Sequence, residues 1–429
     1  MNKYKAIIMP TVLRRMARRM MRRIVWHEIC IVKCVDMLMF FVLSDKTCSN
    51  DFQEERSKMR KEIVRDTRVT VDLGRLKHNM QLIREMVGED VAIMPVIKAN
   101  GYGHGAIGIA PTLMECGVTY LAVATLSEAL DLKDANPDYP VFILGHTPDR
   151  FLHYIVENNI TQTVFSLEQV KTLGELAGKA GKKAKVHVKL DTGFHRLGCM
   201  PTPEYEEEVY QMFKVENVEV EGIFSHLALA GEEEDEAQYR MLTDFIDRLE
   251  KRGCTFRYQH IADSIACVDY PQYRMNMIRP GALIYGMIGF HKGKLPVQQI
   301  MTFRSAISQL HTLQPGEGLS YDYAWKAQRE SIIATLPFGY ADGYPRNMRD
   351  KGYVIINGVK CPLVGIICMD QCMADVTDVP GVCPGMDAVI YGDGSDGSMT
   401  IQEASELAGS NKNEIIARIL ERPAREYVK

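Results

Sequence analysis

Short apolar runs alternate with amphipathic stretches from about residue 67 to about residue 294 of the chain. An apolar run of about four to eight residues between turn signals predicts a buried strand, and an apolar period of about 3.6 residues predicts a helix. Residues 166–180 and 232–252 have the helical period. The strand-like runs are 91–98, 120–124, 141–145, 162–165, 185–191, 218–226, 257–263 and 276–283.

This alternation predicts an α/β fold and, more specifically, a (β/α)8 barrel of the TIM type. Parallel barrel strands are buried on both faces, and their sequences are therefore continuous apolar runs rather than alternating ones. An open doubly wound sheet is the alternative, but no G-x-G-x-x-G sequence follows the first run to favour it.

The pattern changes after about residue 294 to short strands separated by Gly, Pro and Asp turns, which predicts a second, mostly antiparallel β domain. We therefore expect the barrel at 66–295 and the β domain at 296–429, with a first strand at about 66–75 that joins one or the other. The expected strands are 303–313, 331–336, 353–356, 360–364 and 388–391, followed by helices at 401–407 and 413–420.

Residues 1–65 differ from the rest of the chain. Arginine pairs at 14–15, 18–19 and 22–23 would form a basic stripe on one helix face, which suits a membrane surface. Residues 24–43 are rather apolar, but the charges of Glu28, Lys33 and Asp36 interrupt them, so no integral membrane domain is expected. We expect a basic, poorly ordered extension, or an upstream start with Met59 as the true first residue.

Composition and charge narrow the function. Hydrophobic residues make up 46% of the chain and charged residues 25%, as in ordinary globular proteins. The formal net charge of -4 offers no electrostatic case for nucleic acid or an anionic membrane. The 11 cysteines lack zinc-type spacing, so we expect free thiols in a reducing cytoplasm and no metal site.

Polar residues cluster where the predicted barrel strands end, which is where TIM-barrel enzymes place their active sites. Lys98, Asp191 and His226 close the first, fifth and sixth runs, and Ser264 and Arg279 accompany the last two. Taken alone, a strand-end lysine usually reaches into solvent. Lys98, however, precedes a turn with glycines at 101, 103 and 105, through which the backbone can approach a ligand. Partial burial would lower the pKa of its amine and prepare it to attack an aldehyde.

The run from 96 to 105, VIKANGYGHG, resembles the cofactor-attachment motif of the alanine racemase family, which are pyridoxal-phosphate enzymes of fold type III. The resemblance extends in order over about 67–429, through residues 188–198, 224–228, 260–264, 278–281, 284–286, 319–321, 337–343 and 367–371.

The resemblance implies an amino-acid racemase, an isomerase that converts L-alanine to D-alanine for cell-wall peptidoglycan. Lys98 would attach pyridoxal 5'-phosphate as a Schiff base in a homodimer with shared active sites. Racemisation needs a proton removed from one face of the α-carbon and returned to the other. Lys98 and the partner subunit's Tyr321 would be the two bases, with Arg196 or His226 lowering the pKa of the tyrosine.

Further roles follow from the same resemblance. Arg279 would hydrogen-bond the pyridine nitrogen and keep it unprotonated, because an arginine cannot give up its proton there. Lys189 would be carbamylated and orient Arg196; an unmodified lysine paired with Asp191 is the alternative. The other expected residues are Tyr102, Ser264 and Gly281 at the phosphate, His226 beside the cofactor, and Arg196, Met369 and Tyr340 at the substrate.

Several positions depart from the common family pattern: Asp263, Glu421, Gly231, Ile366 and Asp322. Asp263 would put a second anion near the phosphate, and Glu421 stands where a tyrosine commonly touches it. These departures concern the phosphate site and the entrance, and so put the substrate in question rather than the reaction. The alternatives are a serine or broad-specificity racemase of the same fold and, from another class, a non-catalytic pyridoxal-phosphate-binding barrel.

Overall fold

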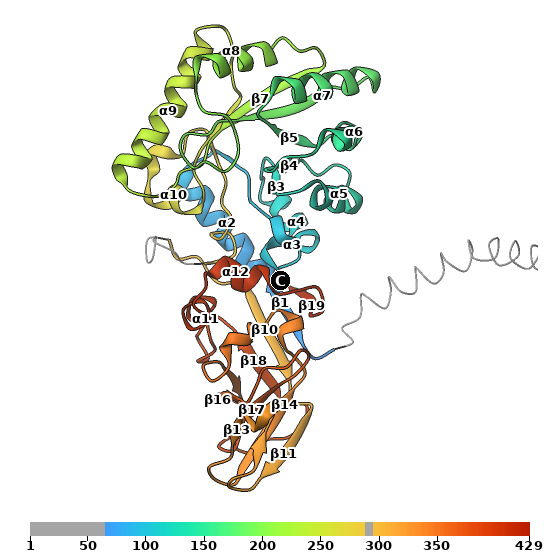
Figure 1. Ribbon diagram of the computed structural model, residues 1–429, viewed down its shortest axis with the longest axis vertical. Coiled ribbons are helices and arrows are strands. Elements are labelled where there is room, and N and C mark those ends of the chain that lie inside the picture. Colours follow the sequence, from blue (N-terminus) through green and yellow to red (C-terminus); the bar gives the residue numbers. More distant parts are fainter. Residues whose placement is uncertain (1–64, 288–294) are drawn as a thin grey trace, which may run out of the picture. The chain divides into compact units, whose positions relative to one another are not determined.

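The computed structural model describes residues 65–287 and 295–429 (Figure 1). The expectations for the N-terminal extension fall outside these residues, except for Arg65. Within the described ranges, every helix is too short or too polar to cross a lipid bilayer.

The first part of the described chain is a barrel-like arrangement of parallel strands. Strands β3 to β8 form one parallel sheet in chain order, and β2 pairs in parallel with β9. A bridge between Val96 and Ala122 joins the β2 segment to β3, and the amide of Arg279 donates to the carbonyl of Ala262 at the other edge. The (β/α)8 prediction is confirmed. The strands are β2 (Ala92–Ile93), β3 (Leu121–Val123), β4 (Val141–Ile143), β5 (Thr161–Val164), β6 (Ala184–Lys189), β7 (Val218–Phe224), β8 (Tyr258–His260) and β9 (Met277–Ile278).

Helices connect the barrel strands, and their starts have a local cause. Thr125 caps α5 in a reciprocal capping box with Glu128, and the Ser166 hydroxyl caps α7. The buried face of α9 includes Leu242, Phe245 and Leu249. The helices are α2 (Leu73–Val87), α3 (Lys98–Tyr102), α4 (Ala106–Glu115), α5 (Leu126–Ala135), α6 (Leu152–Glu157), α7 (Leu167–Lys179), α8 (Pro203–Met212), α9 (Glu232–Glu250) and α10 (Ser264–Asp269).

The second part is a mostly antiparallel nine-stranded sheet in the order β11-β14-β17-β16-β15-β18-β10-β1-β19, as expected for a β domain. The expected strand 303–313 is two strands. It is interrupted at Ile307 and Ser308, whose amides donate to the carbonyls of Met386 and Thr335. The strands are β1 (Arg68–Asp72), β10 (Met301–Ala306), β11 (Gln309–Leu313), β14 (Ser331–Leu336), β15 (Tyr353–Ile356), β16 (Val359–Val364), β17 (Cys372–Asp375), β18 (Asp387–Tyr391) and β19 (Ala424–Val428), with a separate hairpin of β12 (Gly318–Leu319) and β13 (Trp325–Lys326).

Both ends of the described chain meet in this second sheet. Strand β1 pairs antiparallel with β10 and parallel with β19, so the strand that precedes the barrel in sequence lies in the β sheet (Figure 1). Helices α11 (Ile401–Ala408) and α12 (Lys412–Ala417) precede β19. The second helix ends three residues before the expected Leu420, and Arg418 is its C-cap.

Candidate active site at the barrel mouth

Most of the expected site residues lie at the carboxyl ends of barrel strands, where a TIM barrel carries its chemistry. These residues are close enough to interact electrostatically. The charges of Arg279 and Arg196 both lower the pKa of His226, and the charge of Arg196 lowers the pKa of Lys98. Their positions are Lys98 and Tyr102 in α3, Lys189 as the last residue of β6, Arg196 in the following loop, His226 just after β7, Ser264 at the start of α10, and Arg279 and Gly281 after β9.

The turn that carries Lys98 is left-handed. Ala99, Asn100, Gly101 and Tyr102 have φ values of 52°, 53°, 63° and 51°. For residues with a side chain this conformation costs roughly 1–2 kcal/mol each, so other contacts have to hold it. The amide of Gly105 bonds to the carbonyl of Asn100 at 2.8 Å, inside the turn.

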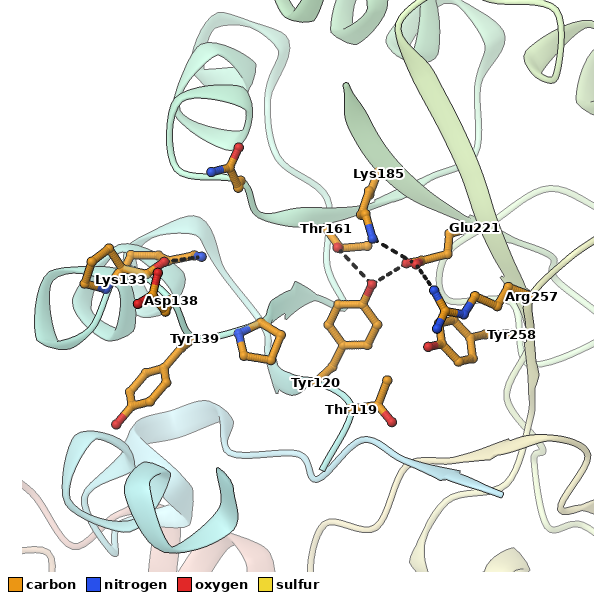
Figure 2. Close-up of a pocket in the computed structure, with 13 residues that line it drawn as sticks. Thr119, Tyr120, Lys133, Asp138, Tyr139, Thr161, Lys185, Glu221, Arg257 and Tyr258 are labelled. Atoms are coloured by element: carbon orange, nitrogen blue, oxygen red, sulfur yellow. Dashed lines mark hydrogen bonds and ion pairs between the residues drawn. The ribbon is translucent and has the colours of Figure 1, made fainter. Parts of the chain in front are cut away.

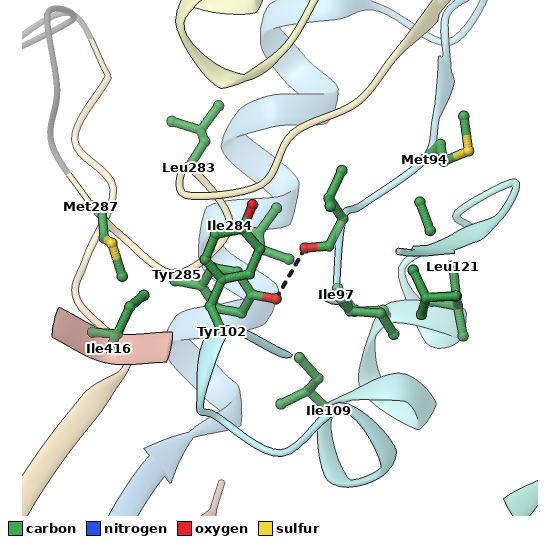
Figure 3. Close-up of a cluster of buried hydrophobic side chains, with 14 of the residues drawn as sticks. Met94, Ile97, Tyr102, Ile109, Leu121, Leu283, Ile284, Tyr285, Met287 and Ile416 are labelled. Carbon is green, nitrogen blue, oxygen red and sulfur yellow. Dashed lines mark hydrogen bonds between the residues drawn. The ribbon is translucent and has the colours of Figure 1, made fainter. Parts of the chain in front are cut away.

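Contacts from His104 and from the C-terminal tail hold the turn from outside. The fully buried His104 donates from Nδ1 to the carbonyl of Gly101 at 2.9 Å and stacks on Tyr285. Arg425 of β19 donates to the carbonyl of Gly103 at 2.9 and 3.1 Å. Tyr285 in turn bonds to the carbonyl of Val96, and the cluster around it extends to α12 (Figure 3). The tail of the β domain thus fixes the loop after Lys98.

Lys98 is suited to act as an amine nucleophile and base. Burial and the nearby charge of Arg196 lower the pKa of Lys98 from its ordinary value. A larger share of the amine is therefore neutral at physiological pH than for an exposed lysine.

Arg279 is 5% exposed and fixed by four contacts. Its Nη1 donates to Nδ1 of His260 at 2.7 Å, and its Nη2 donates to the carbonyls of Ser225 and Ile261 at 2.9 and 3.0 Å and to Nδ1 of His226 at 3.3 Å. Among the described residues no acceptor contacts its Nε. Burial lowers the pKa of Arg279 only to about 10, so it stays charged at neutral pH.

His226 is a neutral imidazole in this arrangement. Burial and the positive charges of Arg279 and Arg196 lower the pKa of His226 to about 2. A neutral His226 cannot assist Tyr321 as a cation, so Arg196 is the remaining one of the two residues expected in that role. The guanidinium of Arg196 lies over the ring of Phe194, with Cζ 4.3 Å from the ring centroid.

Ser264, Gly281 and Tyr102 form a second cluster at the end of the barrel. The Ser264 hydroxyl accepts from the amides of Gly281 at 2.8 Å and Leu283 at 3.3 Å. A Cβ on Gly281 would lie 2.9 Å from the hydroxyl of Tyr102, so a glycine lets these groups converge. Burial and the charge of Asp263 raise the pKa of Tyr102 to about 12, so the phenol stays a hydrogen-bond donor.

Asp263 has a structural role in this arrangement. Its carboxylate caps α10 by accepting from the amides of Ile265 and Ala266, both at 3.0 Å. Its charge thus faces backbone N–H groups, which is how the chain accommodates an acid beside a candidate phosphate site.

Lys189 is 7% exposed and donates to the carbonyl of Leu190 at 2.7 Å. Burial and the charge of Arg279 lower the pKa of Lys189 to about 7. The expected alternative, an ion pair with Asp191, is absent from the described ion pairs, because Asp191 accepts instead from the amides of Gly193 and His195.

The remaining expected residues lie on loops of the β domain, away from the barrel set. The carbonyls of Cys368 and Met369 accept from the amides of Tyr340 and Ala341, which brings two of these loops together. Tyr321, Met369 and Tyr340 have 67%, 52% and 40% of their surface exposed. In the part of the chain that the structure describes, no hydrogen bond or ion pair joins them to the barrel set.

The departures from the family pattern map to these two sets. Gly231 precedes α9 as its N-cap, and Glu421 is exposed on the tail. Ile366 lies beside the turn of Tyr321, because its amide donates to the Ser320 hydroxyl at 3.0 Å. Asp322 in that turn has a φ of 58°, which favours the glycine common in the family.

The described cations and donors fit an anionic aldehyde cofactor. Lys98, Arg196 and Arg279 supply positive charge, whereas the nearby carboxylates of Asp191, Asp263 and Glu128 are engaged by backbone amides. The amine of Lys98, whose pKa is lowered, suits an aldehyde, and the fixed guanidinium of Arg279 suits a ring nitrogen. The cluster of Ser264, Gly281 and Tyr102 suits a phosphate.

Sequence reasoning missed two residues behind this site: His260, which contacts Arg279, and His187, which contacts His260. His187 and His260 lie in the interior of the barrel, with Nδ1 of His187 and Nε2 of His260 2.9 Å apart. Both stand within apolar strand runs, and a histidine in a strand buried on both faces was the available signal.

Two family models match the chain: "Alanine racemase, N-terminal domain" over residues 71–288 and "Alanine racemase, C-terminal domain" over residues 300–427. The chain is 40% identical over 372 residues to alanine racemase 1 of Clostridium acetobutylicum, covering 85% of this chain and 96% of that protein. It is 35% identical to an alanine racemase of Methanococcus maripaludis, covering 83% and 97%. The solved alanine racemase of Clostridium difficile 630 superposes with a TM-score of 0.82 at 33% identity, covering 86% of this chain and 97% of that one.

Proposed function

The chain belongs to the alanine racemase family of amino-acid racemases, and on that premise we propose that it interconverts L- and D-alanine with pyridoxal 5'-phosphate. The family generally depends on this cofactor. The observation that carries the proposal is the barrel-mouth cluster, in which the partly neutral Lys98 shares its environment with Arg196 and the buried Arg279.

The residues that would hold the cofactor follow from their chemistry. Lys98 would bond to the aldehyde carbon, and Arg279 would donate to the ring nitrogen. Ser264, the amide of Gly281 and the Tyr102 hydroxyl would bind the phosphate, and His226 would line the ring. Bound in this way, pyridoxal phosphate supplies an electron sink that acidifies the α-hydrogen of the amino acid.

The chain's own groups would move the proton. Lys98 Nζ would exchange it on the face that yields D-alanine, and the phenol oxygen of the partner subunit's Tyr321 on the face that yields L-alanine. Because an arginine does not give up its proton, Arg279 would leave the ring nitrogen unprotonated and limit side reactions. Arg196 and the backbone amide of the partner subunit's Met369 would hold the substrate carboxylate, with the partner subunit's Tyr340 at the entrance.

The exposed loops of the β domain support a homodimer with shared sites. Tyr321, Met369 and Tyr340 are large exposed side chains on loops that hydrogen bonds join to one another, and such a group of exposed apolar residues marks an interaction surface. A barrel from a second copy would cover them and complete its own site at the same time. D-alanine from this reaction would serve peptidoglycan synthesis.

The direct test is a purified preparation assayed for racemisation of L-alanine and of L-serine, together with its absorption spectrum. We expect a visible band from the attached cofactor and faster racemisation of alanine. A hydroxyl is a small difference for a pocket that has no dedicated partner for it, so some turnover of serine is expected as well. A preparation saturated with pyridoxal phosphate that racemises neither amino acid would overturn the proposal.

Lys189 is expected to carry a carbamate, which would orient Arg196. A neutral amine adds carbon dioxide and releases one proton, and a lysine whose pKa is about 7 supplies that neutral amine at neutral pH. With 13C-labelled bicarbonate we expect a carbamate signal in the 13C spectrum of the enzyme. The signal should vanish in Lys189→Ala and persist in the matched control Lys183→Ala, which changes an exposed lysine just before the same strand. A wild-type spectrum without that signal would contradict the expectation.

A further inference from the structure

A chain of buried polar groups crosses the barrel interior from the candidate site to the opposite end. It consists of Arg279, His260, His187 and Glu221, each no more than 5% exposed. Arg279 Nη1 and His260 Nδ1 are 2.7 Å apart, His260 Nε2 and His187 Nδ1 are 2.9 Å apart, and His187 Nε2 and Glu221 Oε2 are 3.6 Å apart.

Packing fixes both imidazole rings in the chain. His260 stacks on Phe224 with ring centroids 4.6 Å apart and an angle of 10° between the planes. The ring of His187 lies 4.8 Å from that of Phe142. Neither ring can turn without disturbing the barrel core, so the donors and acceptors of the chain have fixed places.

The groups at the two ends of the chain, Arg279 and Glu221, require the same direction of hydrogen bonding. A guanidinium only donates, so Nδ1 of His260 has to accept and its proton has to be on Nε2. That N–H donates to Nδ1 of His187, which places the second proton on Nε2 of His187. The last N–H has no partner at hydrogen-bond distance; it faces the Glu221 carboxylate, an obligate acceptor, at 3.6 Å, so this last link is an electrostatic contact.

Glu221 is held as an anion at the far end of the barrel. It accepts from the Tyr120 hydroxyl and from Lys185 Nζ, the latter at 3.1 Å, and Arg257 lies 3.8 Å away. These groups border a cavity of about 410 Å³ near the amino ends of the strands, where Figure 2 shows them converging on the Glu221 carboxylate. Although burial opposes ionisation, the facing N–H of His187 and the hydrogen bonds from Tyr120 and Lys185 lower the pKa of Glu221 to about 2.

We propose that Glu221, acting through His187 and His260, is a positioning residue for Arg279 in the racemase. The carboxylate sets the direction of the hydrogen bonds along the chain and so keeps Nη1 of Arg279 engaged. With both N–H groups of Nη2 and one of Nη1 engaged, Nε–H and the second N–H of Nη1 are the guanidinium donors left for the cofactor ring. This role rests on the proposed function, since the cofactor ring is what Arg279 would serve.

A glutamine at position 221 would have nearly the same size and shape as the glutamate, but it would no longer fix the direction of the hydrogen bonds. Its amide group can donate to Nε2 of His187, which permits the reverse tautomer in both rings. Nδ1–H of His260 would then face the N–H of Arg279, and two donors cannot share a hydrogen bond. Arg279 would have to shift, and its control of the ring nitrogen would weaken.

Neutron diffraction on crystals of the wild-type enzyme, exchanged into heavy water, tests the tautomers directly. We expect deuterons on Nε2 of both His187 and His260 and none on Nδ1 of either ring. A deuteron on Nδ1 of either ring would overturn the proposal. This result does not depend on activity, so an inactive protein with the expected tautomers would refute the proposed function alone and leave the direction of the chain intact.

The functional readout is the amount of pyruvate released per alanine racemised, a side reaction in which the amino group stays on the cofactor. In Glu221→Gln we expect this ratio to rise about tenfold, which corresponds to about the net worth of one hydrogen bond lost at Arg279. The matched control is Glu219→Gln, the same change two residues earlier on the same strand, which should leave the ratio as in wild type. A ratio for Glu221→Gln equal to that of the control would contradict the role of Glu221.

Discussion

Replacement of Lys98 by alanine is expected to abolish racemisation and to remove the visible absorption of the attached cofactor. The Lys98 side chain would have two roles, as the attachment point of the cofactor and as one of the two bases. General acid–base catalysis alone contributes about 10²–10⁴-fold, so the loss should reach at least the upper end of that range. The measurements are a racemisation assay in both directions and an absorption spectrum of the purified variant.

Lys98→Arg is the matched control for charge. It keeps a cation at the end of the first barrel strand, but a guanidinium neither forms the bond to the aldehyde nor accepts a proton at neutral pH. We therefore expect it to be as inactive as Lys98→Ala while restoring the local charge. Activity in either variant, with the cofactor band intact, would contradict the assignment of Lys98.

Tyr321→Phe is expected to slow racemisation by about 10²–10⁴-fold, the range for loss of one acid–base group. The variant should still fold and bind cofactor, because the side chain is 67% exposed in the single chain. Exchange of the α-hydrogen in heavy water gives the sharper readout. Exchange into D-alanine, through Lys98, should continue, whereas exchange into L-alanine should be lost.

Tyr323→Phe supplies the comparison for this experiment. Tyr323 lies in the same short turn and is 69% exposed, so its loss tests for a general disturbance of the loop. Near-normal activity is expected. Equal losses in the two variants, or loss of exchange into both enantiomers in Tyr321→Phe, would argue against a single tyrosine base on one face.

The sequence pattern predicted the barrel well because its strands are buried on both faces. Each of the eight runs contains a strand, although β2 and β9 are only two residues long. The hydrophobic pattern did not predict strands that are defined by backbone pairing rather than by burial of apolar side chains. Strand β17 contains Asp375 and β19 is partly exposed, so neither is an apolar run. The single strand expected at 303–313 is interrupted by hydrogen bonds to Thr335 and Met386, which are distant in sequence.

The candidate site residues that lie at the ends of predicted strands could be identified from the sequence. Lys98 and His226 close apolar runs and Arg279 lies on the eighth run, and the barrel geometry groups such positions. The left-handed turn after Lys98 was not predictable, because Ala99 and Tyr102 disfavour that conformation and contacts from Arg425 impose it. The neutral state of His226 likewise depends on burial and on charges that converge only in the fold.

Mixing two inactive variants is the most direct test of a racemase with shared sites. In a dimer of one Lys98→Ala chain and one Tyr321→Phe chain, one site has lost both bases and the other has regained both. Random exchange between equal amounts makes half of the dimers mixed, each with one of its two sites complete, so we expect about a quarter of the wild-type activity. No recovery in a sample in which native mass spectrometry detects the mixed dimer would contradict it.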